Sequence, residues 1–350
     1  MKPPFLAFLL VACLFSEAAN SAEDAEVSVL RADRLIEITA GAKPEIYIDG
    51  ELTDATIGKF VATVVTQQLT AGTVYFNSPG GNLLAGIEFG RQIRKTGWST
   101  RIGTKGAKYG EARAGLCSSA CVFAYVGGYY RFSNQGSRIG VHRFSTQGAT
   151  SSDLDVAQVA SAAITAYLGE MGVDIALFER MVQAGKDEVL YLSPSEARVL
   201  RVVNDGILPA TWSLQNAEEI MYLKGEQETS LGIGKFMLMC SKGSLIASGF
   251  YEAGTNASII AASTNRYSLR VDRDFLPIKR LSRPVQAANE YVAAYFQITP
   301  DQVKRLLFAQ QVGLAFHPPN PDLFYGFQID IAGNHQKIVN YVKYCGSQSR

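Results

Sequence analysis

Apolar runs of strand length alternate with amphipathic stretches over roughly the first two hundred residues of this chain. Four such runs occupy residues 45–48, 73–76, 99–102 and 138–141. Between them, residues 54–68 and 83–95 carry apolar side chains at helical spacing, and residues 119–126 are a further apolar stretch that we interpret as a helix. Strands that alternate with helices in this rhythm predict crossover units and a largely parallel sheet.

The pattern changes after about residue 212, where strand-like segments follow one another with turns between them. We expect strands over residues 234–241, 243–251, 257–262, 267–271 and 326–331. Helices are expected to begin at the capping residues Thr299 and Asn334. The fold class is therefore α/β over residues 23–212, followed by a smaller mixed α+β domain over residues 213–350, in which we find no chemical motif and no sign of an internal repeat.

The first 22 residues have the pattern of an export signal. Lys2 supplies a positive start, residues 5–15 are an apolar run too short to span a bilayer, and small residues follow at 18–22. We therefore leave residues 1–22 out of the fold and expect an exported protein, periplasmic or secreted. Because Leu10-Val-Ala-Cys13 also resembles a lipobox, a lipoprotein anchored at Cys13 is the alternative.

Composition excludes several classes of protein. With 47% hydrophobic and 19% charged residues, the chain has the composition of a globular protein. A net charge of +1 without runs of Lys or Arg argues against nucleic acid as the main partner. No apolar stretch reaches the ~20 residues of a membrane-spanning helix.

Four cysteines remain when Cys13 is set aside, and an even number in an exported chain permits two disulfides. Proximity in sequence favours Cys117 with Cys121 and Cys240 with Cys345, although three connectivities are open. No histidine or second cysteine pair lies near Cys117 and Cys121, so we expect no metal site.

Three signals between residues 74 and 144 carry the chemistry. An apolar strand ends in the loop Asn77-Ser-Pro-Gly-Gly81, two serines precede an apolar helix, and the strand Arg138-Ile-Gly-Val-His142 ends on a histidine. A glycine loop presents free N–H groups, and a serine needs a base to become a nucleophile. His142 alone of the chain's three histidines lies in the same predicted domain as these serines. The three signals together predict an acyl-transfer site.

Their order and spacing resemble those of the Clp-protease proteolytic subunit and its crotonase-fold relatives, over roughly residues 45–208. The matching positions are Asn77 to Gly81, Gly86, Ser119, Arg131 and Arg138 to His142. The segment Cys117-Ser-Ser-Ala-Cys121 is similar to that of exported Clp-like proteins with a Cys-x-Ser-Ala-Cys motif. The resemblance implies a repeated ββα core and a serine-peptidase activity.

The resemblance also implies a role for individual residues. The spacing from Ser119 to Gly128 selects Ser119 over Ser118 as the nucleophile, with His142 as its base. The family's acid does not fall in register on an aspartate here, and the nearest candidate, Asp187, is displaced by about two residues. The implied oxyanion-hole donors are the backbone N–H groups of Gly81 and Ala120.

We therefore expect an exported serine peptidase that acts on a peptide or protein substrate without a cofactor. Assembly into a homo-oligomer stays open, but an exported chain would not meet the cytoplasmic Clp ATPase. A serine–lysine dyad is disfavoured because residues 120–185 contain no lysine, and a coenzyme-A enzyme because an exported chain lacks that cofactor. A cysteine nucleophile requires a reduced pair. The alternative is a non-catalytic binding or scaffold protein that retains the fold.

Overall fold

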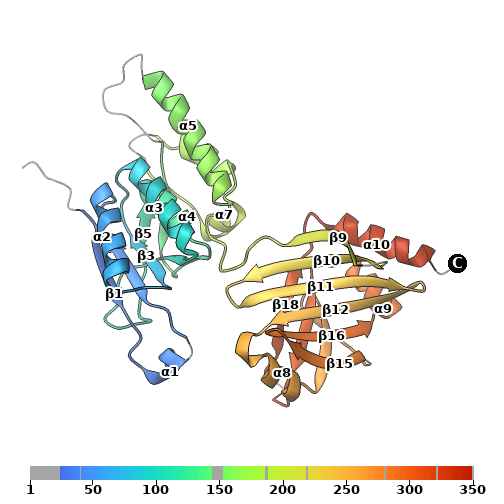
Figure 1. The fold of residues 1–350 in the computed structure, drawn as a ribbon. Coiled ribbons are helices and arrows are strands. Elements are labelled where there is room, and N and C mark those ends of the chain that lie inside the picture. The colour runs from blue at the N-terminus through green and yellow to red at the C-terminus, as the bar shows by residue number, and fades with distance from the viewer. Residues whose placement is uncertain are drawn as a thin grey trace, which may run out of the picture.

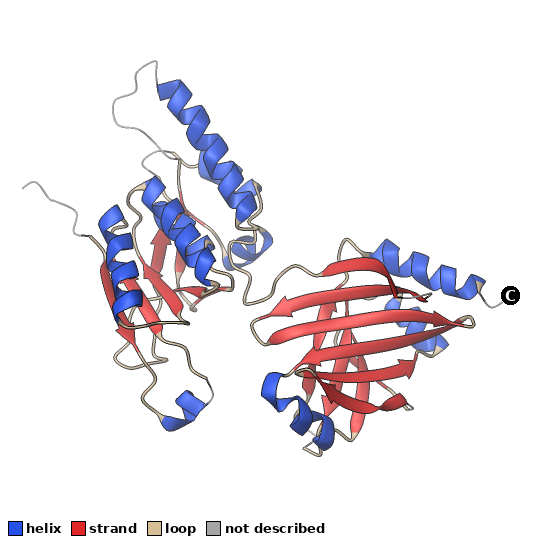
Figure 2. Cartoon of the chain, in the orientation of Figure 1, coloured by secondary structure: helices blue, strands red, loops and turns tan. Residues whose placement is uncertain are grey.

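The computed structural model describes residues 24–39, 41–143, 153–185, 188–217, 220–279, 281–320 and 322–348. They form a mixed α/β protein with several sheets, in which helices and sheets share the first half and strands dominate the second (Figures 1 and 2). Buried apolar side chains gather in two clusters. The first runs from Ala25 to Val203 and the second from Trp212 to Cys345, so each half has its own core. The predicted export signal and Cys13 lie outside the described residues.

A five-stranded sheet with the order β1-β2-β3-β4-β6 forms the centre of the first half. Its strands are β1 (Glu26–Leu30), β2 (Glu45–Asp49), β3 (Thr73–Asn77), β4 (Ser99–Ile102) and β6 (Arg131–Ser133). The strand pairs β2–β3, β3–β4 and β4–β6 are parallel, as the alternating pattern predicts, and β1 pairs antiparallel with β2. A second, smaller sheet joins β5 (Leu116–Ser118), β7 (Arg138–Val141) and β8 (Leu190–Tyr191), with β5 and β7 parallel.

The helices of the first half are α1 (Leu35–Thr39), α2 (Asp54–Thr66), α3 (Leu83–Thr96), α4 (Ala120–Val126), α5 (Asp153–Glu170), α6 (Ala176–Gln183) and α7 (Pro194–Val199). Capping boxes at Thr53 and Ser193 satisfy free N–H groups at the starts of α2 and α7. All seven residues of α4 are buried. This helix therefore lies in the core, and the residue that precedes it is held by its surroundings.

Helix α4 passes α3 at backbone distance, because glycines on α3 leave room for it. A Cβ atom on Gly86 would lie 2.4 Å from the Ala120 carbonyl oxygen, and one on Gly90 would lie 2.5 Å from the Phe123 carbonyl oxygen. No side chain fits at either position without moving the first turn of α4. The glycine at position 86 therefore fixes where α4 begins.

Gly86→Ala is expected to destabilise the protein by about 1–3 kcal/mol, because the added methyl overpacks the contact with Ala120. The matched control is Gly58→Ala in α2, where a Cβ meets no atom within 4 Å and alanine is the better helix former. Urea unfolding should show opposite signs for the two variants. Equal effects would contradict the close approach of α3 and α4.

The second half contains two sheets, with strand orders β15-β16-β12-β11-β10-β9 and β14-β13-β17-β18. The strands are β9 (Thr211–Ala217), β10 (Ile220–Thr229), β11 (Gly232–Ser241), β12 (Ser244–Glu252), β13 (Arg266–Val271), β14 (Asp274–Pro277), β15 (Leu281–Ala288), β16 (Tyr291–Gln297), β17 (Gln311–His317) and β18 (Tyr325–Asp330). The helices are η1 (Gly254–Asn256), α8 (Ala257–Ser263), α9 (Pro300–Leu306) and α10 (His335–Ser347). The strand expected at residues 257–262 is wrong, since the segment forms α8 and packs Ala257 and Ile260 into the core.

Topology reveals an internal repeat that the sequence does not show. Apart from the short helix η1, the units β11-β12-α8-β13-β14 and β15-β16-α9-β17-β18 have the same element order. Equivalent strands pair antiparallel, β12 with β16 and β13 with β17. Gly249 faces Ala294 in the first pair and Leu269 faces Leu314 in the second. Both pairs join residues 45 positions apart (294 − 249 and 314 − 269). The two repeated units are therefore related as by a two-fold axis.

Hydrogen bonds connect the two halves of the chain. The Tyr129 and Tyr130 hydroxyls both donate to the Glu228 carboxylate at 3.0 Å, and the Ser230 N–H donates to the Gly206 carbonyl at 2.7 Å. Tyr129 follows the end of α4 closely in sequence. The second half is therefore attached next to the C-terminal end of α4, whereas residue 119 precedes its N-terminal end.

The structure contains the disulfides Cys117–Cys121 and Cys240–Cys345, the pairing that proximity favours. The first closes a loop of sequence separation 4 around Ser119, and the second joins β11 to α10 across a separation of 105. None of the described helices has both the length and the apolar character required to cross a bilayer.

Replacing Cys240 and Cys345 by serine is expected to lower the free energy of unfolding by about 4–5 kcal/mol in the chain-entropy treatment, because the cross-link closes a long loop. The same change at Cys117 and Cys121 is expected to cost only about 2 kcal/mol, because that loop is short. Denaturant unfolding of the two double variants compares these losses. A larger loss at Cys117 and Cys121 would contradict the loop-length argument.

Candidate functional site

Ser119 occupies a sharp turn between β5 and α4, with φ 56° and ψ −126°. For any residue other than glycine, this backbone conformation costs about 1–3 kcal/mol, and it persists only where the surrounding structure holds it. The Ser119 N–H donates to the Gly140 carbonyl at 2.9 Å, and the Ser118 N–H donates to the Ser78 carbonyl at 3.1 Å. The Ser119 side chain makes no capping hydrogen bond. Ser119 is therefore not an ordinary helix cap, because such caps have extended backbone angles and accept from the first turn.

The neighbouring serine has a different environment. Ser118 is only 4% exposed, and its hydroxyl has no hydrogen-bond partner in the described part of the chain. A Cβ on Gly140 would lie 2.5 Å from the Ser118 Oγ, so this hydroxyl lies against the backbone of β7. Ser119 is half-buried and lines a cavity, which makes it the accessible hydroxyl of the two.

A small cavity of about 30 Å³ joins the predicted nucleophile to the predicted base. The described residues that line it are Leu83, Ser119, Ala120, Val122, Phe123, Val141, His142 and Met181. Residues far apart in sequence meet here because β5 and β7 pair in parallel, which brings the residues after both strands to one edge of the sheet. Within the described residues, Ser119 and His142 share this cavity without a hydrogen bond between them. Such bonds are often long or absent before a substrate binds.

One ring nitrogen of His142, Nδ1, has a hydrogen-bond partner in the main chain. This atom lies 2.8 Å from the Arg143 carbonyl oxygen. Because a carbonyl can only accept, Nδ1 carries the proton and Nε2 of the neutral ring is left as the acceptor. The Arg143 guanidinium in turn donates to the Val182 carbonyl at 2.7 Å, which ties this residue to the end of α6. Asp187, the predicted acid, lies outside the described residues.

The predicted oxyanion donors flank the strained turn. Gly80 and Gly81 have φ values of 119° and 138°, which only glycine adopts readily, and a Cβ on Gly80 would lie 2.7 Å from the Ser119 Cβ. The glycine loop thus lies against the turn. Among the described residues, no acceptor pairs with the N–H of Gly81 or of Ala120. Both groups are free to bind developing negative charge.

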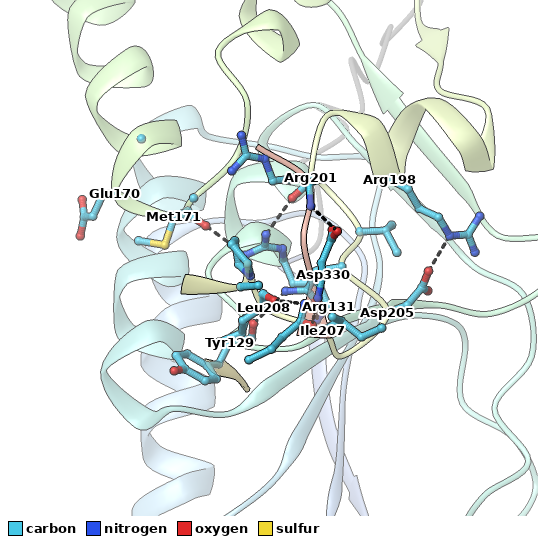
Figure 3. A pocket seen from close by; sticks show the side chains of 18 of the residues that line it. Tyr129, Arg131, Glu170, Met171, Arg198, Arg201, Asp205, Ile207, Leu208 and Asp330 are labelled. Atoms are coloured by element: carbon cyan, nitrogen blue, oxygen red, sulfur yellow. Dashed lines mark hydrogen bonds and ion pairs between the residues drawn. The ribbon is translucent and has the colours of Figure 1, made fainter. Parts of the chain in front are cut away.

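A larger cavity of about 750 Å³ lies where the two halves meet, and Arg131 stands at its wall (Figure 3). Arg131 is 3% exposed, and burial lowers its pKa to about 10, so it stays charged at neutral pH. Its guanidinium donates to five carbonyls at 2.7–3.3 Å, those of Val126, Gly128, Met171, Arg201 and Val202. The Val126 carbonyl belongs to the last residue of α4, and the other four come just after the C-terminal ends of α4, α5 and α7. The helix dipole favours a cation at these ends. Arg131 therefore has a structural role.

A second serine–histidine pair lies in the other half, and its geometry excludes the same chemistry. The Ser268 Oγ lies 3.0 Å from the His317 Nε2, but the His317 Nδ1 lies 3.4 Å from the Arg266 guanidinium. Because a guanidinium only donates, Nδ1 is the acceptor and Nε2 carries the proton. Burial, with Arg266 beside the ring, lowers the pKa of His317. This histidine cannot take a proton from Ser268.

The part of the chain that the structure describes contains no group of three or more His, Cys, Asp or Glu residues able to hold an ion. Sequence reasoning did not identify the Arg143 carbonyl as the partner of His142, because a main-chain acceptor has no sequence signal. It also did not identify Met181, which reaches the cavity from α6. An apolar position on an amphipathic helix looks the same in sequence whether it fills a core or lines a site.

No family model and no curated protein matches the chain. Among solved structures, the chain is similar to a mutant of the 1510-N membrane-bound stomatin-specific protease, at 20% identity. The match covers 45% of this chain and 75% of that one, with a TM-score of 0.33. Neither the fold nor the activity of this chain follows from a likeness of this size.

Proposed function

We propose that the protein is an exported serine peptidase with Ser119 as nucleophile and His142 as base. Its catalytic domain is the segment 23–212, with the repeated ββα core of the Clp-protease and crotonase group, and residues 213–350 form a second domain without catalytic groups. The observation that carries the proposal is the strained turn that brings Ser119 into one cavity with His142. Strain of this kind concentrates at functional sites.

The proposed reaction is an acyl transfer in two halves. His142 Nε2 takes the proton of the Ser119 hydroxyl as Oγ attacks the peptide carbonyl. The N–H groups of Gly81 and Ala120 bind the oxyanion, each contributing about 3 kcal/mol to the transition state. His142 then protonates the leaving amine, and water releases the acyl group by the same steps in reverse.

In this proposal the Arg143 carbonyl keeps His142 in the tautomer that the first step requires. A carboxylate from Asp187 is the other candidate for this task. Asp187→Asn separates the two: activity within a few-fold of wild type supports the carbonyl, and a loss of about 10⁴-fold supports the acid.

Export is supported by the two disulfides, which persist in oxidising compartments. Both sulfurs next to the nucleophile are paired, which leaves no thiolate to act in place of Ser119. The substrate of the proposed reaction is a peptide or protein, and no cofactor is required for any step.

The test is labelling of the folded, oxidised protein with a fluorophosphonate probe, followed by mass spectrometry of the labelled peptide. The expected adduct is on Ser119 and is lost in His142→Ala. An adduct on Ser118 would overturn the assignment of the nucleophile. A folded, oxidised wild type that takes no label would favour the alternative, a non-catalytic binding or scaffold protein.

A further inference from the structure

The Cys117–Cys121 disulfide encloses the residue that the proposed reaction uses as its nucleophile. Cys117 lies in β5, Cys121 lies in the first turn of α4, and Ser119 is the middle residue between them. Both cysteines are 0% exposed, so the cross-link belongs to the core of the first half. The bond therefore joins the two elements that the strained turn connects.

The start of α4 lacks the usual attachment of a helix end. A capping side chain normally accepts from the first N–H groups of a helix. The Ser119 side chain makes no such bond, and among the described residues no acceptor pairs with the Ala120 N–H. The proposed reaction needs that N–H free for the oxyanion, which rules out a conventional cap. The disulfide attaches the start of the helix to β5 and leaves the N–H free.

The strain at Ser119 and the constraint from the cross-link are of similar size. A residue other than glycine prefers relaxed conformations over a strained one by roughly 5- to 150-fold. Closing a loop of sequence separation 4 by a disulfide restricts the open chain by roughly 30-fold in the chain-entropy treatment. The cross-link is therefore large enough to decide whether the strained turn of Ser119 is populated.

We infer that this disulfide positions the nucleophile, and that hydrolysis therefore depends on oxidation of Cys117 and Cys121. The inference rests on the proposed function and concerns the regulation of the same site. As the S–S bond forms, the two thiols lose two protons and two electrons, and a disulfide oxidant accepts them and is reduced to two thiols. Because cytosolic thiols are kept reduced, the newly made chain stays inactive until it is exported.

The experiment compares two double variants of the mature chain, Cys117→Ser/Cys121→Ser and the matched control Cys240→Ser/Cys345→Ser, on the p-nitrophenyl ester of N-acetylalanine. Loss of the first disulfide is expected to lower kcat by roughly tenfold or more with KM within a few-fold, because fewer molecules hold the nucleophile in place. The control should keep the wild-type kcat, although its longer loop makes it lose more stability. A disulfide that served stability alone would not lower kcat more than the control does.

A second measurement changes the redox state without changing the residues beside Ser119. The Cys240→Ser/Cys345→Ser chain is unfolded, reduced with dithiothreitol and refolded with or without oxidised glutathione. Unfolding is required because Cys117 and Cys121 are buried from a reductant in the folded protein. Activity should appear only with oxidation, while circular dichroism shows a folded chain in both states and mass spectrometry after alkylation counts the free thiols.

The outcomes separate this inference from the proposed function. Wild-type kcat in Cys117→Ser/Cys121→Ser, or equal activity of the reduced and the oxidised refolded chain, overturns the inference alone. A chain that folds only when the bond has formed also overturns it, since the two cysteines would then serve folding. An oxidised wild type that neither hydrolyses the ester nor takes the fluorophosphonate label overturns the proposed function instead.

Discussion

Ser119→Ala is expected to lower kcat/KM for hydrolysis of the p-nitrophenyl ester of N-acetylalanine by at least about a thousandfold, with the fold intact. The reason is that a serine nucleophile acts as a unit with its base. The rate enhancement that remains in the variant comes from the oxyanion donors and from substrate binding. Ester hydrolysis under single-turnover conditions measures the loss, and circular dichroism confirms that the variant is folded. Because alanine keeps the Cβ atom, the backbone strain at this position is unchanged, and the stability of the variant should stay close to that of wild type.

Ser118→Ala is the matched control, because Ser118 is adjacent but its hydroxyl is buried against β7. It should retain hydrolysis within about tenfold of wild type. A double variant Ser119→Ala/His142→Ala should lose little more than either single variant, since the two groups carry one function. Additive losses, or full activity in Ser119→Ala, would contradict the assignment.

Arg131→Met is expected to destabilise the protein by about 2–4 kcal/mol, the largest effect on stability that we predict for a single substitution. The change keeps much of the apolar stem but removes the cation from a site that is 3% exposed. Five carbonyls at the ends of three helices then lose a charged donor at once. The Arg94 guanidinium still donates to those of Val126, Gly128 and Met171, so the cost falls mainly on the Arg201 and Val202 carbonyls, because buried acceptors without partners are costly. Urea unfolding at neutral pH, where the wild-type guanidinium is charged, measures the loss.

Arg201→Met provides the comparison for this prediction. Its guanidinium lies beside the same cavity (Figure 3), but it is exposed, and its one carboxylate contact, with Asp174, is 3.7 Å long. Its removal should change stability by less than about 1 kcal/mol, as for other surface pairs. If Arg131→Met were as mild as Arg201→Met, the helix ends would not depend on the buried cation.

Local structure in the first half could be predicted well from the sequence. The alternation of apolar runs with amphipathic stretches determined the parallel strands β2, β3 and β4 and the helices between them, because burial on one face imposes a period that sequence displays directly. Short apolar runs are ambiguous, which is why residues 257–262 were predicted as a strand and form α8.

The second half shows where prediction stops. Its repeated ββαββ unit was not predicted from the sequence, since a fold can keep its hydrogen-bond pairing and burial while the side chains diverge. The pair Ser268–His317 likewise resembles a catalytic pair by composition alone. Only the position of Arg266 beside the second ring nitrogen excludes it as a nucleophile and base.

The sequence by itself determined which groups are available for chemistry: two adjacent serines, one histidine in the same half, a glycine loop and two cysteines that flank the serines. The tertiary structure decided which of these groups meet. It buries Ser118 and opens Ser119, places the Arg143 carbonyl on His142, and brings Met181 from α6 to the cavity. The physical reason is that periodic burial is a local property of the chain, whereas main-chain acceptors and cavity walls arise only when distant segments pack together.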